Sequence, residues 1–389
     1  MKRINTVDIV RGIVMVIMAL DHTRDLLHIP ALTQDPTDLA TTTAPIFLTR
    51  WITHLCAPTF VFLSGTSAYL SLLRRSDRPG GLADARSFLR KRGLVLILLE
   101  ITVINFAFWT DIQFRSLMLQ VIFAIGGGLV LLSWLSKISA RWLGGIGLLI
   151  IGLHGLLALL PAFTNPAVRL GWALLFRTEV FPISANFILL VAYPLIPWFG
   201  IMLVGFACGP VFVLPPEQRR KRFVYYGLLS LGVFVIVRAI NVYGSAPWSV
   251  QKDPLFTLLS FINVNKYPPS LLYTAVTLGV MFVMLWLADG ADNAFTRVMT
   301  VYGKVPLFYY ILHWYLVKAA MTAMVLLQGF RLSDMPLGSL SFGRPPGSGL
   351  SLLGVYAVWL GIVVVLYPLC RWYGRYKADH PHIGWLRYV

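Results

Sequence analysis

Charged residues are scarce in this chain: Asp, Glu, Lys and Arg make up 13% of its 389 residues, whereas hydrophobic residues make up 57%. Together with a mean hydropathy of +0.73, this composition is typical of membrane proteins and excludes a soluble globular enzyme. The three cysteines, Cys56, Cys208 and Cys370, are far apart and lie in or beside apolar stretches. They form no CxxC pair or disulfide framework, so redox chemistry is not expected.

Acidic residues are also few, 16 against 33 Lys and Arg, which gives a formal net charge of +17. The basic residues occur in short runs between apolar stretches, as topology determinants do, so we expect no nucleic-acid partner. If the N-terminus is cytoplasmic, 21 of the 33 basic residues fall on the cytoplasmic side, 11 fall on the other side, and Arg11 lies within the first helix. The positive-inside rule therefore predicts that both termini are cytoplasmic.

The long apolar stretches predict an all-α, polytopic membrane helical bundle, with a single transmembrane domain over residues 1–389. We expect the first helix to be retained, because Arg11 interrupts its apolar run and no small-residue cleavage site follows. The longest connections, 161–186, 242–269 and 327–349, leave no room for a soluble domain and are predicted to be packed caps on the outer side. About ten spanning helices are predicted, near residues 7–27, 52–73, 93–110, 115–135, 142–160, 187–208, 223–241, 270–288, 303–326 and 350–370.

The first predicted helix carries ionisable residues, which are costly inside a membrane and are therefore functional candidates. Arg11 and His22 lie about 20° apart in azimuth and about 16 Å apart along such a helix. This face suits a ligand bound lengthwise, with an anionic end held by Arg11 and a reacting end beside His22. Asp21, Arg24 and Asp25 surround the imidazole in sequence. Asp25 is expected to orient the ring and to stabilise the imidazolium.

Two further histidines are expected in the same water-accessible layer. His54 begins the second predicted helix and His28 follows the first, so each is either part of the site or an interfacial residue. A second imidazole beside His22 would allow proton relay or substrate orientation. We predict no metal, because a catalytic zinc site needs three convergent ligands and no close pair of histidines shares a helical face.

A cation and an aromatic residue precede the eighth predicted helix, in the segment Asn265-Lys266-Tyr267-Pro268-Pro269. Lys266 and Tyr267 are expected to engage an acidic or sugar ligand, although Pro at a helix start is also ordinary punctuation. His313, in the ninth helix, is interpreted as a packing residue, and His154 is assigned no role. The candidate catalytic residues are thus His22, Asp25, His28 and His54, and the candidate cofactor-binding residues are Arg11, Lys266 and Tyr267.

Six segments of the chain carry recognisable motifs: Val7–Gly12, Leu20–Asp25, His54–Gly65, Tyr193–Gly200, Lys266–Tyr273 and Gly303–His313. With these motifs, the chain resembles the bacterial branch of the heparan-α-glucosaminide N-acetyltransferase-like family, which is related to the acyltransferase-3 family. The resemblance covers nearly the whole chain, and the motifs are specific together although no single one is. The spacing of Arg11 and His22 also resembles the signature of the acyltransferase-3 family, in which the Arg is associated with acyl-CoA and the His with catalysis.

The resemblance implies an acyl-CoA-dependent O- or N-acyltransferase of the bacterial inner membrane. It would move an acetyl or short acyl group from cytoplasmic acetyl-CoA, or another acyl-CoA, to a sugar hydroxyl or amine of an envelope glycan on the outer side. The implied partners are acyl-CoA, a glycan acceptor and membrane lipids, and a homodimer stays open. The animal enzyme has Asn where this chain has His22, and its catalytic His lies further on, so His28 competes with His22 for the role of base. The alternative function is a membrane transporter or lipid flippase that uses the same intramembrane charges.

Overall fold

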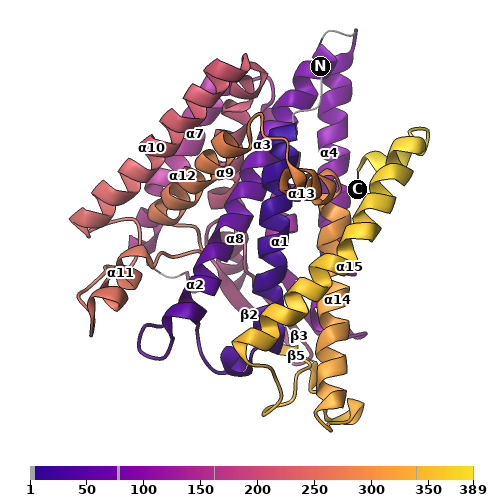
Figure 1. Ribbon diagram of the computed structural model, residues 1–389. Helices are drawn as coiled ribbons and strands as arrows, with labels where there is room; N and C mark the ends of the chain where they lie inside the picture. The colour runs from indigo at the N-terminus through magenta and orange to yellow at the C-terminus, as the bar shows by residue number, and fades with distance from the viewer. Residues whose placement is uncertain (1–4, 77–78, 162, 339, 389) are drawn as a thin grey trace.

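Helices dominate the structure, a computed structural model that describes residues 5–76, 79–161, 163–338 and 340–388. Figure 1 shows them as a bundle of long helices with a small sheet at one end. The α-helices are α1 Asn5–Leu27, α2 Ala44–Ile52, α3 Cys56–Ser76, α4 Gly81–Leu99, α5 Asn105–Trp109, α6 Val121–Leu135, α7 Ala140–Leu153, α8 Pro166–Phe176, α9 Leu195–Ala207, α10 Pro216–Ile240, α11 Pro254–Ile262, α12 Leu271–Ala288, α13 Ala294–Lys304, α14 Pro306–Leu327 and α15 Leu352–Asp379.

Eight helical stretches of the described residues are long and apolar enough to cross a membrane. Several combine adjoining elements: α2 continues into α3, a π-helical turn at Glu100–Ile104 joins α4 to α5, and a 3-10 turn at His154–Leu159 extends α7. The other stretches are α9 with its extension to Val213, and helices α10, α12, α14 and α15. The predicted all-α polytopic membrane fold is therefore confirmed.

The other two predicted spans differ from these eight. Helix α1 has 23 residues but carries Asp8, Arg11, Asp21, Arg24 and Asp25, so its composition is less apolar than that of the eight stretches. Helix α6 has only 15 residues, because the first part of the predicted helix 115–135 is a strand.

A three-stranded sheet corrects two of the predicted helix starts. Strand β1 (Ser116–Leu119) occupies the start of the predicted helix 115–135, and β3 (Phe187–Val191) occupies the start of the predicted helix 187–208. The strand order is β1-β3-β2, with β3 parallel to β1 and antiparallel to β2 (Glu179–Ser184). Short apolar runs fit a strand or a helix equally well, and here pairing between distant segments satisfies the backbone. A two-stranded ribbon, β4 (Leu337–Gly338) with β5 (Ser341–Phe342), lies in a predicted cap.

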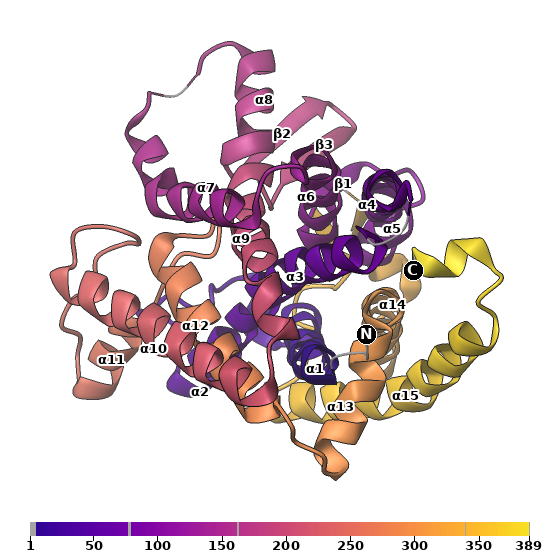
Figure 2. The same ribbon diagram turned by 90° about the horizontal axis from the view of Figure 1, so that it is seen from above.

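Helix α1 lies in the middle of the bundle, in contact with α3, α12, α13, α14 and α15, as Figure 2 shows in the view from above. Its packing against α13 depends on two glycines. A Cβ atom at Gly12 would lie 1.9 Å from the carbonyl oxygen of Met299, and one at Gly303 would lie 1.7 Å from that of Asp8. Small residues that allow backbones to approach this closely are typical of membrane helix interfaces. The close packing holds the polar face of α1 in one position.

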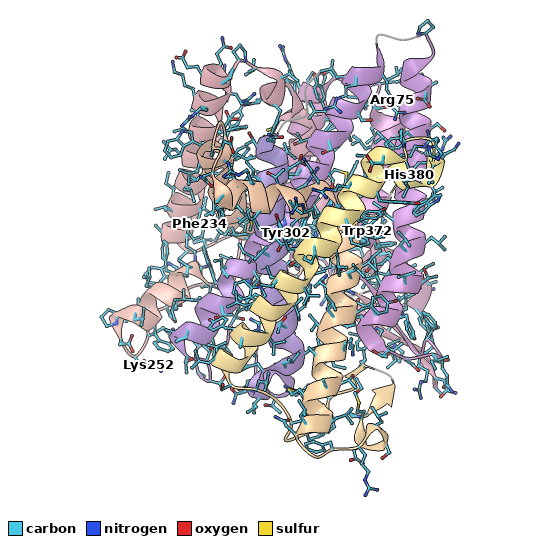
Figure 3. All side chains as sticks on the ribbon, turned by 45° about the vertical axis from the view of Figure 1, so that its right-hand side comes forward. Arg75, Phe234, Lys252, Tyr302, Trp372 and His380 are labelled. Carbon is cyan, nitrogen blue, oxygen red and sulfur yellow. The ribbon has the colours of Figure 1, made fainter. Side chains whose placement is uncertain are left out.

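The two ends of the bundle differ in what they carry. The N and C marks both lie in the upper half of Figure 1, whereas the sheet and α11 lie in the lower half. Figure 3 places Arg75 and His380 near one end and Lys252 at the opposite end. We call the end near Arg75 the basic end, and the end near β2 and Lys252 the sheet end. Because α1 starts at the basic end, its Asp21–Leu27 part reaches the sheet end.

Candidate functional site

A cavity of about 300 Å³ opens beside the last turns of α1. Its wall combines α1 with the α2–α3 stretch, the sheet, the segment before α12, and α14. Such convergence of polar groups in one concave space is the usual form of a binding or active site. The lining residues include Asp21, His22, Asp25, Arg50, Cys56, Phe60, Gln120, Thr178, Tyr193, Lys266, Tyr267 and Tyr310.

An ion cluster around Asp21 is at the centre of this wall. The buried Asp21 carboxylate accepts hydrogen bonds from Arg24 Nη2 at 2.9 Å and from Arg50 Nη1 at 3.0 Å. Lys266 Nζ lies 4.0 Å from the same carboxylate. Arg24 also pairs with Asp25, so three cations face two carboxylates. One positive charge is left in excess, which favours an anionic ligand or a developing negative charge.

The His22 imidazole packs on an aromatic platform from α14. Its ring centroid lies 3.9 Å from that of Trp314 and 5.2 Å from that of His313. His22 Nδ1 is buried and has no hydrogen-bond partner in the described part of the chain. The predicted orientation of this ring by Asp25 is therefore wrong, because the Asp25 carboxylate binds Arg24 instead. Packing, rather than a carboxylate, sets the angle of the His22 ring.

The other two candidate histidines lie outside this cavity wall. His54 is buried, with its ring edge-on to Tyr273 at 5.4 Å, while its neighbours Thr53 and Cys56 line the cavity. His28 lines a separate, smaller pocket at the end of α1, and its carbonyl accepts a hydrogen bond from Arg344. Burial, with the charges of Arg24 and Arg344, lowers the pKa of His28 below its ordinary value. The structure thus brings neither imidazole beside His22.

Lys266 and Tyr267 line the cavity opposite α1. The Tyr267 hydroxyl lies 3.5 Å from that of Tyr193, and Lys266 Nζ lies 5.1 Å from the Tyr267 ring centroid. Burial by itself would raise the pKa of Tyr267, but the charges of Lys266 and Arg50 outweigh it, so the pKa is lowered. Burial raises the pKa of Tyr193. The positive charges of the cluster therefore act on the Tyr267 phenol.

Arg11 lines a second cavity, nearer the basic end of the bundle. This cavity, of about 140 Å³, also contains Arg92 and the hydroxyls of Ser64 and Ser67. Arg11 Nη2 donates to the Ser67 hydroxyl and, at 3.1 Å, to the Leu63 carbonyl. The expected shared face of Arg11 and His22 thus opens into two spaces, one at each residue. Three residues, Phe60, Val121 and Tyr310, contribute to the lining of both cavities.

Several site residues were not predicted from the sequence. Arg50 binds Asp21, Trp314 supports His22, and the amide nitrogen of Gln120 is buried in the cavity wall without a hydrogen-bond partner. His313, interpreted as a packing residue, lies beside His22. Trp314 directly follows the Gly303–His313 motif, and this position was the signal in the sequence that could have identified it. No group of three or more His, Cys, Asp or Glu side chains suited to a metal ion occurs among the residues that the structure describes.

Comparison with known protein families finds a match over most of the chain. Residues 3–236 match the family model described as heparan-alpha-glucosaminide N-acetyltransferase, catalytic. The match covers more than half of the chain and includes Arg11, His22 and Arg50, whereas Lys266 and Trp314 lie beyond it. A search of curated proteins finds no match.

Proposed function

The chain belongs to the heparan-alpha-glucosaminide N-acetyltransferase catalytic family, and we propose from this membership that it transfers an acyl group from acyl-CoA to a sugar. Membership of this family, together with the apolar helices, makes it a multi-pass membrane acyltransferase. The proposed donor is acetyl-CoA or another short acyl-CoA. The proposed acceptor is a hydroxyl or amine of an envelope glycan.

The meeting of the two cavities along α1 is the observation that carries this proposal. Arg11 and Arg92 supply cations to one cavity, and His22 with its ion cluster lines the other. Because Phe60, Val121 and Tyr310 belong to both linings, the two spaces are neighbours at these side chains. CoA is long and polyanionic, so its phosphates suit the Arg11 side while the thioester reaches His22. This arrangement supports donor and acceptor approaching from opposite ends.

The chemistry assigned to His22 is general base catalysis. Neutral imidazole takes a proton from the acceptor nitrogen or oxygen as that atom attacks the thioester carbonyl. The new bond to the acceptor forms, the C–S bond breaks, and the imidazolium returns the proton to the CoA thiolate. The excess positive charge shared by Arg50, Lys266 and Arg24 would stabilise the oxyanion that forms on the carbonyl.

The proposed orientation places the basic end in the cytoplasm of a bacterial cell, with the chain in the inner membrane. The distribution of Lys and Arg supports it, since 21 of the 33 lie in the termini and connections assigned to that side. Arg75 and His380, which follows α15, lie in the same half of the molecule in Figure 3. The donor would then enter from the cytoplasm, and the acceptor from the outer side.

The deciding experiment measures transfer by purified protein in detergent. Radiolabelled acetyl-CoA is mixed with glucosamine, and both CoA thiol release and labelled product are followed. A positioned general base contributes about 10² to 10⁴ in rate, so His22→Gln should lose that much turnover while CoA still binds. His28→Gln is the matched control and should stay close to the parent. Parent-like turnover in His22→Gln would remove His22 from the chemistry.

A second arm separates direct attack from covalent catalysis, in which the imidazole first accepts the acyl group. The enzyme is incubated with labelled acetyl-CoA without acceptor and then mapped by mass spectrometry. Direct attack predicts no acetylated histidine. A stoichiometric acetyl-His22 that delivers its label when glucosamine is added would replace the direct scheme with the covalent one.

A further inference from the structure

A cavity of about 740 Å³ lies outside the His22 site and shares no lining residue with it. It is formed by the 3-10 extension of α7, helix α8, the start of β2, the turn after α10 and the segment before α12. Figure 2 shows α8 at the edge of the molecule beside β2. The lining includes His154, Arg169, Trp172, Phe176, Arg177, Glu179, Tyr243, Ser245, Asn265, Pro268 and Ser270.

Two chain segments separate this cavity from the one that contains His22. Along the start of β2, Arg177 and Glu179 line the large cavity while Thr178, between them, lines the His22 cavity. Such alternation is expected of an extended chain, whose successive side chains point to opposite sides. In the segment before α12, Asn265 and Pro268 likewise line the large cavity, whereas Lys266 and Tyr267 line the His22 cavity. The two spaces are therefore neighbours, with these two chain segments between them.

The side chains of the large cavity combine an aromatic surface with free polar groups. Trp172 lies in an aromatic row, 4.5 Å from Phe176 between ring centroids. Arg169 and Glu179 neutralise each other in an ion pair. Arg177 and the side-chain amide of Asn265 are exposed and have no described partner. An aromatic face beside planar polar donors suits a sugar ring, which offers C–H groups on its faces and hydroxyls at its edge.

We propose that this cavity binds the sugar units next to the one that reacts, so that the acceptor is an oligosaccharide rather than a monosaccharide. The inference rests on the proposed function, since it extends the acceptor from the His22 cavity across the wall at Thr178 and Tyr267. The unpaired Arg177 additionally favours an anionic substituent on these units. A lipid tail would use the aromatic row but would gain nothing from Arg177 or Asn265.

Binding and transfer are measured separately to test this subsite. The probes are glucosamine and its β-1,4-linked tetrasaccharide, with the full-length protein in detergent. Direct binding of the tetrasaccharide should weaken about tenfold or more in Trp172→Ala, Arg177→Ala and Asn265→Ala, the loss expected when one well-made contact is removed. Transfer to glucosamine itself should stay at the parent level in all three. Trp142→Ala, at an exposed tryptophan outside the cavity, is the matched control for losing an indole.

The two arms distinguish the two proposals. The subsite is wrong if the tetrasaccharide fails to bind the parent, or if all three variants bind it as well as Trp142→Ala does. Tetrasaccharide binding that depends on Trp172 and Asn265, with no acetyl transfer by the parent, would overturn the proposed function and leave the subsite standing. Because Asn265 is exposed, its variant reports on the subsite even where Trp172→Ala fails to fold.

Discussion

The His22 imidazole lies against the Trp314 indole with ring centroids 3.9 Å apart. In the proposed mechanism this contact takes the place of the carboxylate that usually orients a catalytic histidine. Trp314 is fully buried and packs edge-on against Phe108 on its other side, at 4.8 Å. A buried aromatic pair of this kind can hold a ring in one orientation through packing alone. Trp314 is therefore a positioning residue for His22.

Trp314→Phe should lower kcat about tenfold and leave the KM for acetyl-CoA near the parent value, because a smaller ring holds His22 less closely. Trp314→Tyr should recover part of the rate. Steady-state kinetics with acetyl-CoA and glucosamine checks both. The control is Trp109→Phe, a buried tryptophan that packs on Phe108 and Phe342 but not on His22. Equal losses in Trp109→Phe and Trp314→Phe would show general loosening of the core.

Arg11→Ala should weaken CoA binding about tenfold or more, since it removes a cation from the cavity nearer the basic end. Its folding should suffer less, because the groups that Arg11 binds, the Leu63 carbonyl and Ser67 hydroxyl, also bond to each other. Titration with CoA, alongside thermal unfolding, measures the two effects. Arg11→Lys keeps the charge and should retain most of the affinity. CoA binding that is unchanged in a folded Arg11→Ala protein would exclude the donor role.

Asp21→Asn should destabilise the fold strongly, by about 3–5 kcal/mol, because it leaves buried cations without their shared carboxylate. The cations concerned are Arg24, Arg50 and Lys266. Thermal unfolding in detergent gives the comparison. The matched control is Asp84→Asn, which breaks an exposed pair with Arg75 and should cost about 0–1 kcal/mol. Similar melting temperatures for the two variants would contradict the account of the ion cluster.

Single cysteines at the two ends of the bundle test the proposed orientation. In a background without Cys56, Cys208 and Cys370, Asp84→Cys should be labelled only from the cytoplasmic side and Lys252→Cys only from the outer side. The two positions lie at opposite ends of the molecule. Asp84 pairs with Arg75, which Figure 3 shows at the end opposite Lys252. An impermeant maleimide applied to intact cells or inverted vesicles reads the result. The reverse pattern would exchange the donor and acceptor sides.

His28 should make the fold less stable in mild acid. Its pKa is lowered in the folded state by burial and by Arg24 and Arg344, so the unfolded chain binds its proton more readily. Stability is therefore expected to fall as pH decreases through the unfolded value of about 6.5, until the folded state is protonated as well. In melting experiments across this range, His28→Asn should lose less stability than the parent. Parallel curves for the two proteins would show that His28 does not contribute.

Local properties of the chain were sufficient to predict the bundle. Spanning helices can be recognised from long runs of apolar residues. Such runs form helices because every backbone polar group inside a membrane must be hydrogen-bonded within the protein. Helical periodicity also predicted that Arg11 and His22 share a face of α1, since both residues belong to one rigid element. The failures of this reasoning are at β1 and β3, where short apolar runs pair with each other rather than continue as helices.

The composition of the site was decided by tertiary structure. The sequence by itself determined which residues are costly in a membrane, but not that Arg50 and Lys266 would both reach Asp21, or that α14 would bring Trp314 against His22. It also could not show that Asp25 binds Arg24 and leaves the His22 ring alone. Apart from the pair of neighbours Arg24 and Asp25, these contacts join segments far apart along the chain. They depend on how closely helices approach, as at Gly12 and Gly303, and this distance is set by the packing of all neighbouring side chains at once.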